Sequence, residues 1–275
     1  MSLVLGRVDR SGVRLICDSQ ITDPSQLRSN LIPGRLKLVT LHSNLCVGYV
    51  GQPNVAIDAI REAVPIADFA DIVEFLFKCH RSKGEAADFL VASLDPTSLA
   101  KIADGQVYQE GPQHWIGDPN AVHVFEKHYS QAPDPKSGEP EDIVTGKVLQ
   151  AFDNTVADPQ APTVGGIVFS VVPTRKGLLY APAARAFFSS QTIPSGIETP
   201  LRFGTAVEGA YAYSIYVPES GVAVVGVYFL QGRCGLLYRP LVTDEALWIT
   251  DVSQKDFPQR VRQVSGVAVR GVTFD

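Results

Sequence analysis

Residues 2–20 read SLVLGRVDRSGVRLICDSQ, and this stretch decides how the fold begins. Apolar residues dominate two runs, 2–9 and 12–18, and the turn sequence Asp-Arg-Ser-Gly joins them. Gly12 can adopt the positive φ that a tight turn requires. The stretch therefore predicts a β-hairpin with strands over 2–9 and 12–18.

Further along the chain, the spacing of apolar residues alternates between strand and helix periods. It predicts helices over 55–64, 67–83, 119–129 and 141–156, the last ending near Asp158-Pro159. It predicts strands over 36–41, 44–51, 89–96, 99–108, 114–117, 165–172, 177–182, 210–217, 221–229, 234–240 and near 264–274. Residues 131–140 are expected to form a Pro/Gly-rich surface loop. From about Phe188 the sequence is rich in Ser, Thr, Pro and Gly and predicts irregular structure. This order of elements is typical of an α+β protein with two antiparallel sheets under helical layers.

Composition excludes several classes of function. The chain has 275 residues, enough for a sizeable core, and a net charge of −5 without a basic, aromatic-rich cluster, so nucleic acid is not an expected partner. No apolar run approaches the roughly 20 residues of a membrane span, and no signal peptide is expected. The four cysteines are widely separated, which predicts free thiols in a cytoplasmic protein: Cys17, Cys46, Cys79 and Cys234.

A metal site is not expected either. His114, His123 and His128 lack the spacing and acidic partner of a zinc helix, so we expect surface histidines and no cofactor or metal.

Ser2 raises a question of chemistry. Aminopeptidases generally remove Met before a small residue, so we expect the mature chain to begin at Ser2, with a free α-amine beside its own hydroxyl. That amine, with an ordinary pKa of about 7.7–8.0, can act as a general base at neutral pH. Such a nucleophile also needs a cation, a carboxylate that orients the cation, and a backbone N–H that binds the oxyanion.

Residues at five positions resemble those of proteasome β-subunits and their bacterial relatives, which are N-terminal-nucleophile (Ntn) hydrolases. Ser2, the turn glycine Gly12 and the triplet DSQ that begins with Asp18 fall at the family's intervals. After a slightly longer loop, Lys37 in RLKLVTL is similar to the family's lysine, and Gly51 in NLCVGYVGQ follows it at the family's interval.

The resemblance extends over residues 2–185. Residues 89–118 look like the family's middle hairpin and the turn after it, and residues 163–182 look like its Gly-Gly strand and the hairpin that follows. The resemblance implies a four-layer αββα sandwich over residues 1–188, with a β-rich extension over 189–275 packed on it or continuing it. It also implies a homo-oligomer, as a ring or stacked rings.

The resemblance also implies the role of each site residue. Ser2 Oγ would be the nucleophile and the Ser2 α-amine its general base. The charge of Lys37 would lower the pKa of the nucleophile, Asp18 would orient Lys37, and the Gly51 N–H would bind the oxyanion. The implied reaction is hydrolysis of a peptide or amide bond through an acyl-enzyme ester.

Five positions depart from the family's pattern. Ser2 replaces the usual Thr, Gln20 replaces the usual Arg of the triplet, and Asp118 replaces the serine of the Gly-Ser-Gly turn. Ala161 and Val164 stand where the family has an Asp and a Ser that support the nucleophile's amine. These replacements are expected to affect turnover more than the fold.

Several alternatives stay open. Asp118, Asp158 or Thr163 could replace the missing support. The chain could instead be a proteasome-like assembly or binding protein without catalysis, or an amidase acting on a small molecule, since fold does not fix substrate. Taken singly, Asp18 could be a turn residue, Lys37 a solvated edge-strand lysine and Gly51 a helix start, and Met1-Ser2-Leu3 could be a cloning remnant.

Overall fold

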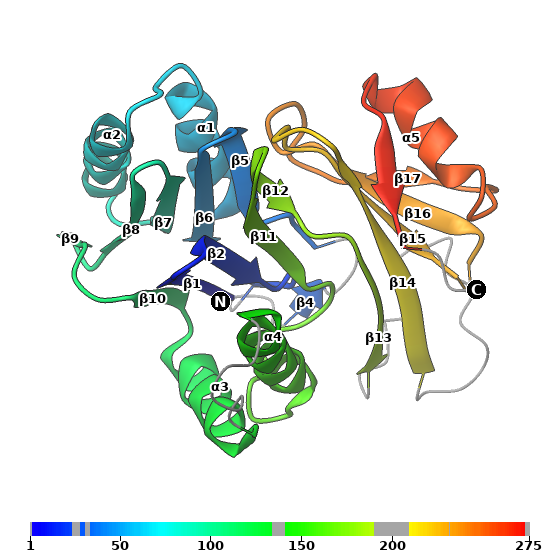
Figure 1. The fold of residues 1–275 in the computed structure, drawn as a ribbon, viewed down its shortest axis with the longest axis horizontal. Coiled ribbons are helices and arrows are strands. Elements are labelled where there is room, and N and C mark those ends of the chain that lie inside the picture. The colour runs from blue at the N-terminus through cyan, green and yellow to red at the C-terminus, as the bar shows by residue number, and fades with distance from the viewer. Residues whose placement is uncertain are drawn as a thin grey trace.

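The structure is a computed structural model that describes residues 2–23, 28–30, 34–133, 141–189, 209–230 and 232–272. Within these residues the chain forms three antiparallel sheets of five, six and five strands, a short two-stranded hairpin and five helices (Figure 1). The hairpin consists of β3 (Ile21–Asp23) and β4 (Arg28–Asn30).

The first sheet contains the hairpin predicted from residues 2–20. Its strand order is β10-β1-β2-β11-β12, with β1 (Leu3–Asp9), β2 (Gly12–Cys17), β10 (Gln113–Gly117), β11 (Phe169–Thr174) and β12 (Gly177–Tyr180). Asp9 pairs with Gly12, whose φ is 129°, so the expected turn is confirmed. Since β2 also pairs with β11, Cys17 lies opposite Phe169, and the segment around Gly165 comes next to Asp18.

The second sheet is covered by the first two helices. Its strand order is β5-β6-β7-β8-β9, with β5 (Leu38–His42), β6 (Leu45–Gly51), β7 (Ala87–Leu94), β8 (Thr97–Ala103) and β9 (Gln106–Tyr108). Helices α1 (Pro53–Ala63) and α2 (Phe69–Ser82) bury Ile57 and Leu76 against Val47 and Phe89 of this sheet. The Asp68 carboxylate caps α2 by accepting N–H groups from its first turn.

Helices α3 (Pro119–Gln131) and α4 (Glu141–Ala157) pack against the first sheet. Phe125 of α3 and Phe152 of α4 meet edge to face and share a buried cluster with Leu5 and Ile16. The predicted end of α4 before Asp158 is confirmed.

The C-terminal third forms a sheet of its own, on the right in Figure 1. Its order is β13-β14-β15-β16-β17, and β18 pairs with β14; the strands are β13 (Ala183–Ser189), β14 (Gly209–Pro218), β15 (Val225–Phe229), β16 (Cys234–Tyr238), β17 (Leu247–Ile249) and β18 (Val269–Gly271). Helix α5 (Phe257–Ser265) covers it, and the Phe257 ring lies so close to Gly235 that a Cβ there would be 2.4 Å from the ring. The sequence predicted strands that overlap β14, β15, β16 and β18, but not β13, β17, helix α5 or the sheet that they form.

The expected four-layer αββα sandwich with an extension is wrong. The described chain is mostly β-sheet, with three antiparallel sheets, and the third sheet contributes to the main core instead of adding to its edge. Val4 of the first sheet, Leu38 of the second, and Val227 and Leu236 of the third belong to one buried cluster. Strand patterns show which residues are buried but not which sheet a strand joins, so the sequence could not reveal this arrangement.

Two expectations about side chains have different outcomes. The four cysteines are free thiols, as expected. His114 is only 9% exposed, so the expectation that it lies on the surface is wrong; burial and the nearby charge of Lys101 lower the pKa of His114.

Some expectations fall outside the described residues, namely most of the loop at 131–140 and the irregular stretch after Phe188, of which 190–208 are not described. The boundary at residue 188 stays a prediction. Among the described helices, none has the length and apolar character needed to cross a membrane.

Candidate functional site

Asp18 is the centre of a buried polar network directly after β2. Its side chain is fully buried. Oδ1 accepts the Leu3 N–H at 3.0 Å and Lys37 Nζ at 2.8 Å. Oδ2 accepts the N–H groups of Gln20 at 3.0 Å and Gly165 at 3.3 Å. Three backbone donors and one ammonium group therefore satisfy the carboxylate, as burial of a charge requires.

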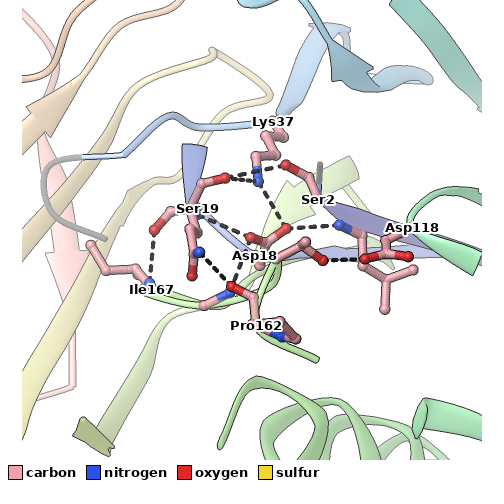
Figure 2. A network of polar contacts seen from close by, with 11 residues as sticks. Ser2, Asp18, Ser19, Lys37, Asp118, Pro162 and Ile167 are labelled. Atoms are coloured by element: carbon pink, nitrogen blue, oxygen red, sulfur yellow. Dashed lines mark hydrogen bonds and ion pairs between the residues drawn. The ribbon is translucent and has the colours of Figure 1, made fainter. Parts of the chain in front are cut away.

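Lys37 lies just before β5 and is 3% exposed. Its Nζ donates to Asp18 Oδ1 and, at 2.6 Å, to the carbonyl oxygen of Gln20 (Figure 2). A solvated edge-strand lysine would keep its ammonium group in water. Lys37 is instead half of a buried ion pair, and that pair fixes the direction of its side chain.

Ser2 approaches the same carbonyl from β1. Its hydroxyl donates to the Gln20 carbonyl oxygen at 3.2 Å, and the residue is 6% exposed. Figure 2 shows the Ser2 hydroxyl and the Lys37 ammonium group converging on that single oxygen. The fold thus brings Ser2, Asp18 and Lys37 together, although Ser2 precedes β1, Asp18 follows β2 and Lys37 precedes β5.

Gly51 borders a cavity of about 600 Å³ that Ser2 and Lys37 also line. Its φ is 94°, and an added Cβ would lie 2.3 Å from the Ala86 carbonyl oxygen, so this position requires glycine. The Tyr49 N–H donates to the Lys37 carbonyl oxygen at 3.0 Å. Because N–H groups alternate sides along a strand, we expect the Gly51 N–H to face the same side as that of Tyr49, toward Lys37.

Gly117 and Asp118 hold the main chain of Ser2. The Asp118 N–H donates to the Ser2 carbonyl oxygen at 2.9 Å, and Leu3 pairs with Gly117 in the sheet. Gly117 has a φ of 114°, and a Cβ there would lie 1.8 Å from the Ser2 carbonyl oxygen. The path of the chain at Ser2 therefore depends on the absence of a side chain at Gly117.

The Gly117→Ala variant is expected to lose about 3 kcal/mol of unfolding free energy or more, because the backbone strain adds to a backbone clash. Gly84→Ala is the matched control, since Gly84 also has a positive φ, of 65°, but no atom lies within 4 Å of its added Cβ. Its unfolding free energy should fall only by the cost of the backbone strain, about 1 kcal/mol. Urea unfolding of both variants measures the difference, and equal losses would contradict the close contact with Ser2.

The support expected for the amine of Ser2 is arranged differently from the family's pattern. Ala161 and Val164 are buried in the apolar cluster under α3 and α4. The Asp118 carboxylate caps α3 by accepting the Asn120 N–H at 2.9 Å, and its other oxygen accepts the Thr163 hydroxyl. The buried Asp118 and the half-buried Thr163 thus form a hydrogen-bonded pair beside Ser2.

Asp158 takes no part in this pair. Its carboxylate accepts the Gln160 N–H at 2.8 Å and lies 2.9 Å from His128 Nε2.

Cys17, next to Asp18, is the other candidate nucleophile in this region. It is fully buried, and burial raises its pKa to about 12 although the charge of Lys37 acts in the opposite direction. Cys17 therefore stays a neutral thiol at physiological pH and does not compete with Ser2.

The sequence did not predict the roles of Ser19, which joins two segments of the site, or of Arg35 and Tyr49, which line the cavity. Ser19 is fully buried, and its Oγ accepts the Ile167 N–H at 2.8 Å, which ties the segment after Asp18 to the segment before β11. Arg35 and Tyr49 line the cavity with Ser2. Arg35 lies two residues before Lys37, and Tyr49 lies two residues before Gly51. In an extended chain, residues two positions apart lie on the same side, and this spacing was the signal in the sequence that could have identified them.

Comparison with known proteins finds similarity among solved structures. No protein-family model and no curated protein matches the chain. Among solved structures, the chain is similar to a Gly-1 mutant of Anbu, a proteasome-related protein, from Hyphomicrobium sp. strain MC1. The identity is 11% and the TM-score 0.47, over 62% of this chain and 81% of that one. A likeness at this identity and TM-score does not show what the chain does.

Proposed function

We propose that this chain is an N-terminal-nucleophile hydrolase that cleaves peptide or amide bonds through an ester on Ser2. The observation that supports this most is the convergence of Ser2 Oγ and Lys37 Nζ on the Gln20 carbonyl oxygen at the edge of a cavity. The buried carboxylate of Asp18, 2.8 Å from Lys37 Nζ, keeps that ammonium group in place.

In the first half of the proposed reaction, Ser2 Oγ attacks the substrate carbonyl carbon and its proton passes to the Ser2 α-amine. The positive charge of Lys37 stabilises the serine oxygen as it becomes more negative, and the Gly51 N–H donates to the oxyanion. The C–N bond then breaks, the α-ammonium group returns the proton to the leaving amine, and the acyl group stays on Ser2 as an ester.

In the second half, water replaces the amine. The α-amine takes a proton from the water as it attacks the ester carbonyl. The tetrahedral intermediate collapses, the C–O bond to Ser2 breaks, and the proton returns to Ser2 Oγ. The products are a carboxylic acid, an amine and the regenerated hydroxyl, so no cofactor is required.

This mechanism needs a free α-amine on Ser2, so the peptide bond that precedes Ser2 has to be cleaved before turnover. We further propose peptide substrates and a homo-oligomeric assembly, which rest on the resemblance to proteasome-like proteins. The four free thiols support a reducing compartment such as the cytoplasm.

One observation favours a second candidate, a proteasome-like binding or assembly protein without catalysis. Ala161 and Val164 are apolar and buried where the family has polar supports for the amine. The Asp118–Thr163 pair beside Ser2 argues for the hydrolase instead, because it keeps two hydrogen-bonded polar side chains at this place.

Intact-mass spectrometry with a peptide epoxyketone tests the hydrolase directly, since this reagent needs a terminal hydroxyl and the adjacent α-amine. The expected result is a chain that begins at Ser2 and gains the mass of one inhibitor. A chain that begins at Ser2 and stays unlabelled at millimolar reagent would favour the non-catalytic candidate. A chain that keeps its residue before Ser2 would do the same.

A further inference from the structure

A second cavity, of about 150 Å³, lies between the first sheet and helix α4. Leu5 of β1 and Ile16 of β2 line it from the sheet, and Val148 and Leu149 line it from α4. These four residues also belong to, or pack against, the buried cluster under α3 and α4. The cavity shares no lining residue with the cavity beside Ser2, so it is a separate candidate site.

Arg7 and Arg14 face the helical side of the sheet, where this cavity lies. Successive side chains of a strand point to opposite faces, so Arg7 shares the face of Leu5, and Arg14 shares the face of Ile16. The contacts agree with this, because Arg7 Nη1 donates to the hydroxyl of Tyr129 on α3 at 2.9 Å. Both arginines line the cavity, at the end nearer the turn between β1 and β2.

The charges at this end of the cavity are not balanced. Arg7 and Arg14 lie directly opposite one another in the β1–β2 pair, and like charges in that position repel. Asp9 compensates one of them, since its Oδ2 lies 2.9 Å from Arg14 Nε. In the described part of the chain no carboxylate pairs with Arg7, whose side chain donates to the neutral hydroxyl of Tyr129. The three charged residues that line the cavity thus leave one positive charge without a counter-charge.

The rest of the cavity is apolar. Apart from the three charged residues and Ser170, every residue that lines it has an aliphatic side chain. A cavity of this volume with such walls can hold a ring the size of benzene. Water is a poor occupant of the aliphatic part, because a buried water needs two or more polar partners.

One kind of molecule matches both parts of the cavity. Its apolar body would fill the aliphatic part, and a carboxylate would supply the missing negative charge to Arg7. A guanidinium group suits a carboxylate because two of its N–H groups can donate to the two carboxylate oxygens. A carboxylate also carries a single negative charge, which equals the uncompensated charge at this end.

We propose that this cavity binds a small monocarboxylic acid with an apolar body about the size of a benzene ring. The body lies between Ile16 and Leu149, and the carboxylate accepts hydrogen bonds from Arg7. This site goes beyond the proposed hydrolase and does not depend on it, because no residue of the network around Ser2 lines the cavity.

Isothermal titration calorimetry of the full chain, at low salt and neutral pH, tests the charge requirement. The probes are benzoate and its uncharged analogue benzamide. Benzoate is expected to bind with a dissociation constant of about 1 mM or lower, and at least about tenfold more tightly than benzamide, since a hydrogen bond to a charged group is worth about that factor. Equal affinities, or no binding of benzoate, would overturn the proposal.

Two matched variants assign the preference to Arg7, and each removes one positive charge from the same hairpin. Arg7→Met keeps an unbranched apolar stem, so benzoate should bind no more tightly than benzamide. Arg10→Met is the control, because Arg10 is exposed and does not line the cavity. It should leave both affinities unchanged. A preference that survives Arg7→Met, or that Arg10→Met removes, would contradict the site.

The Val172→Phe variant tests where the apolar body lies. Val172 lines the cavity from β11, and a phenylalanine there would occupy the space that the ring needs. Benzoate affinity should fall at least about tenfold, because the ring then buries little apolar surface. Urea unfolding checks that the variant is folded, and unchanged benzoate affinity in the folded variant would overturn the proposal. If Val172→Phe does not fold, the comparison of Arg7→Met with Arg10→Met decides by itself.

Labelling with the peptide epoxyketone separates this inference from the proposed function. Labelling of Ser2 without selective binding of benzoate would support the hydrolase and overturn the carboxylate site. Selective binding of benzoate by a chain that stays unlabelled would support the carboxylate site and contradict the hydrolase. The Ser2→Ala variant should bind benzoate as tightly as the unmodified chain does.

Discussion

The Ser2→Ala variant is expected to hydrolyse peptide or amide substrates at least about 10⁴-fold more slowly than the unmodified chain, because it lacks the proposed nucleophile. Its fold should remain. The substitution removes one hydrogen bond, from Ser2 Oγ to the Gln20 carbonyl oxygen, and that oxygen still accepts Lys37 Nζ. The expected loss of stability is therefore no more than about 1.5 kcal/mol. Initial rates and urea unfolding measure the two effects.

Ser2→Thr is the matched control for this prediction. It keeps the hydroxyl and the α-amine, and its methyl group restricts the rotamer of the hydroxyl. Activity should stay within about tenfold of the unmodified chain. Full activity in Ser2→Ala would refute the role of Ser2 as the nucleophile.

The Lys37→Met variant is expected to lose about 10²–10⁴-fold in kcat/KM, the range associated with assisted proton transfer. It is also expected to lose about 3–5 kcal/mol of unfolding free energy, because Asp18 remains as a buried carboxylate without its cation. Activity loss alone would thus be ambiguous, since an unfolded protein is also inactive.

The double variant Lys37→Met with Asp18→Asn resolves that ambiguity. It removes both charges of the buried pair, so much of the stability should return. Activity should stay low, because no cation remains beside Ser2. A double variant that recovers both stability and activity would show that Lys37 matters only for folding.

Local sequence patterns predicted the elements that carry the site. The hairpin of β1 and β2 follows from alternating apolar residues and a turn glycine, and it delivers Ser2 and Asp18 to neighbouring strands. The end of α4 before Asp158-Pro159 follows from proline, which lacks the N–H that a helix needs. These features depend on residues close together in the chain, where propensity is informative.

Contacts between distant segments could not be predicted in this way. The Gly165 N–H that bonds to Asp18 comes from a residue 147 positions later. Helix α5 has apolar residues at helical spacing, Phe257, Val261 and Val264, but with nine residues it is short and was not predicted. The third sheet could not be predicted because the same apolar strands could have extended either of the other two.

The segment 239–245, which follows β16, contacts Arg35, one of the residues that line the cavity, and it is made late in translation. Arg61 donates to the Pro240 carbonyl oxygen at 3.1 Å and pairs with Asp244 at 2.7 Å, so this segment is held against α1. A ribosome makes Ser2 first and Asp244 much later. During translation, the hairpin that carries Ser2 can form while that segment is still missing. The nascent chain therefore completes the contacts of α1 and of the cavity-lining Arg35 only after most of the protein has been made.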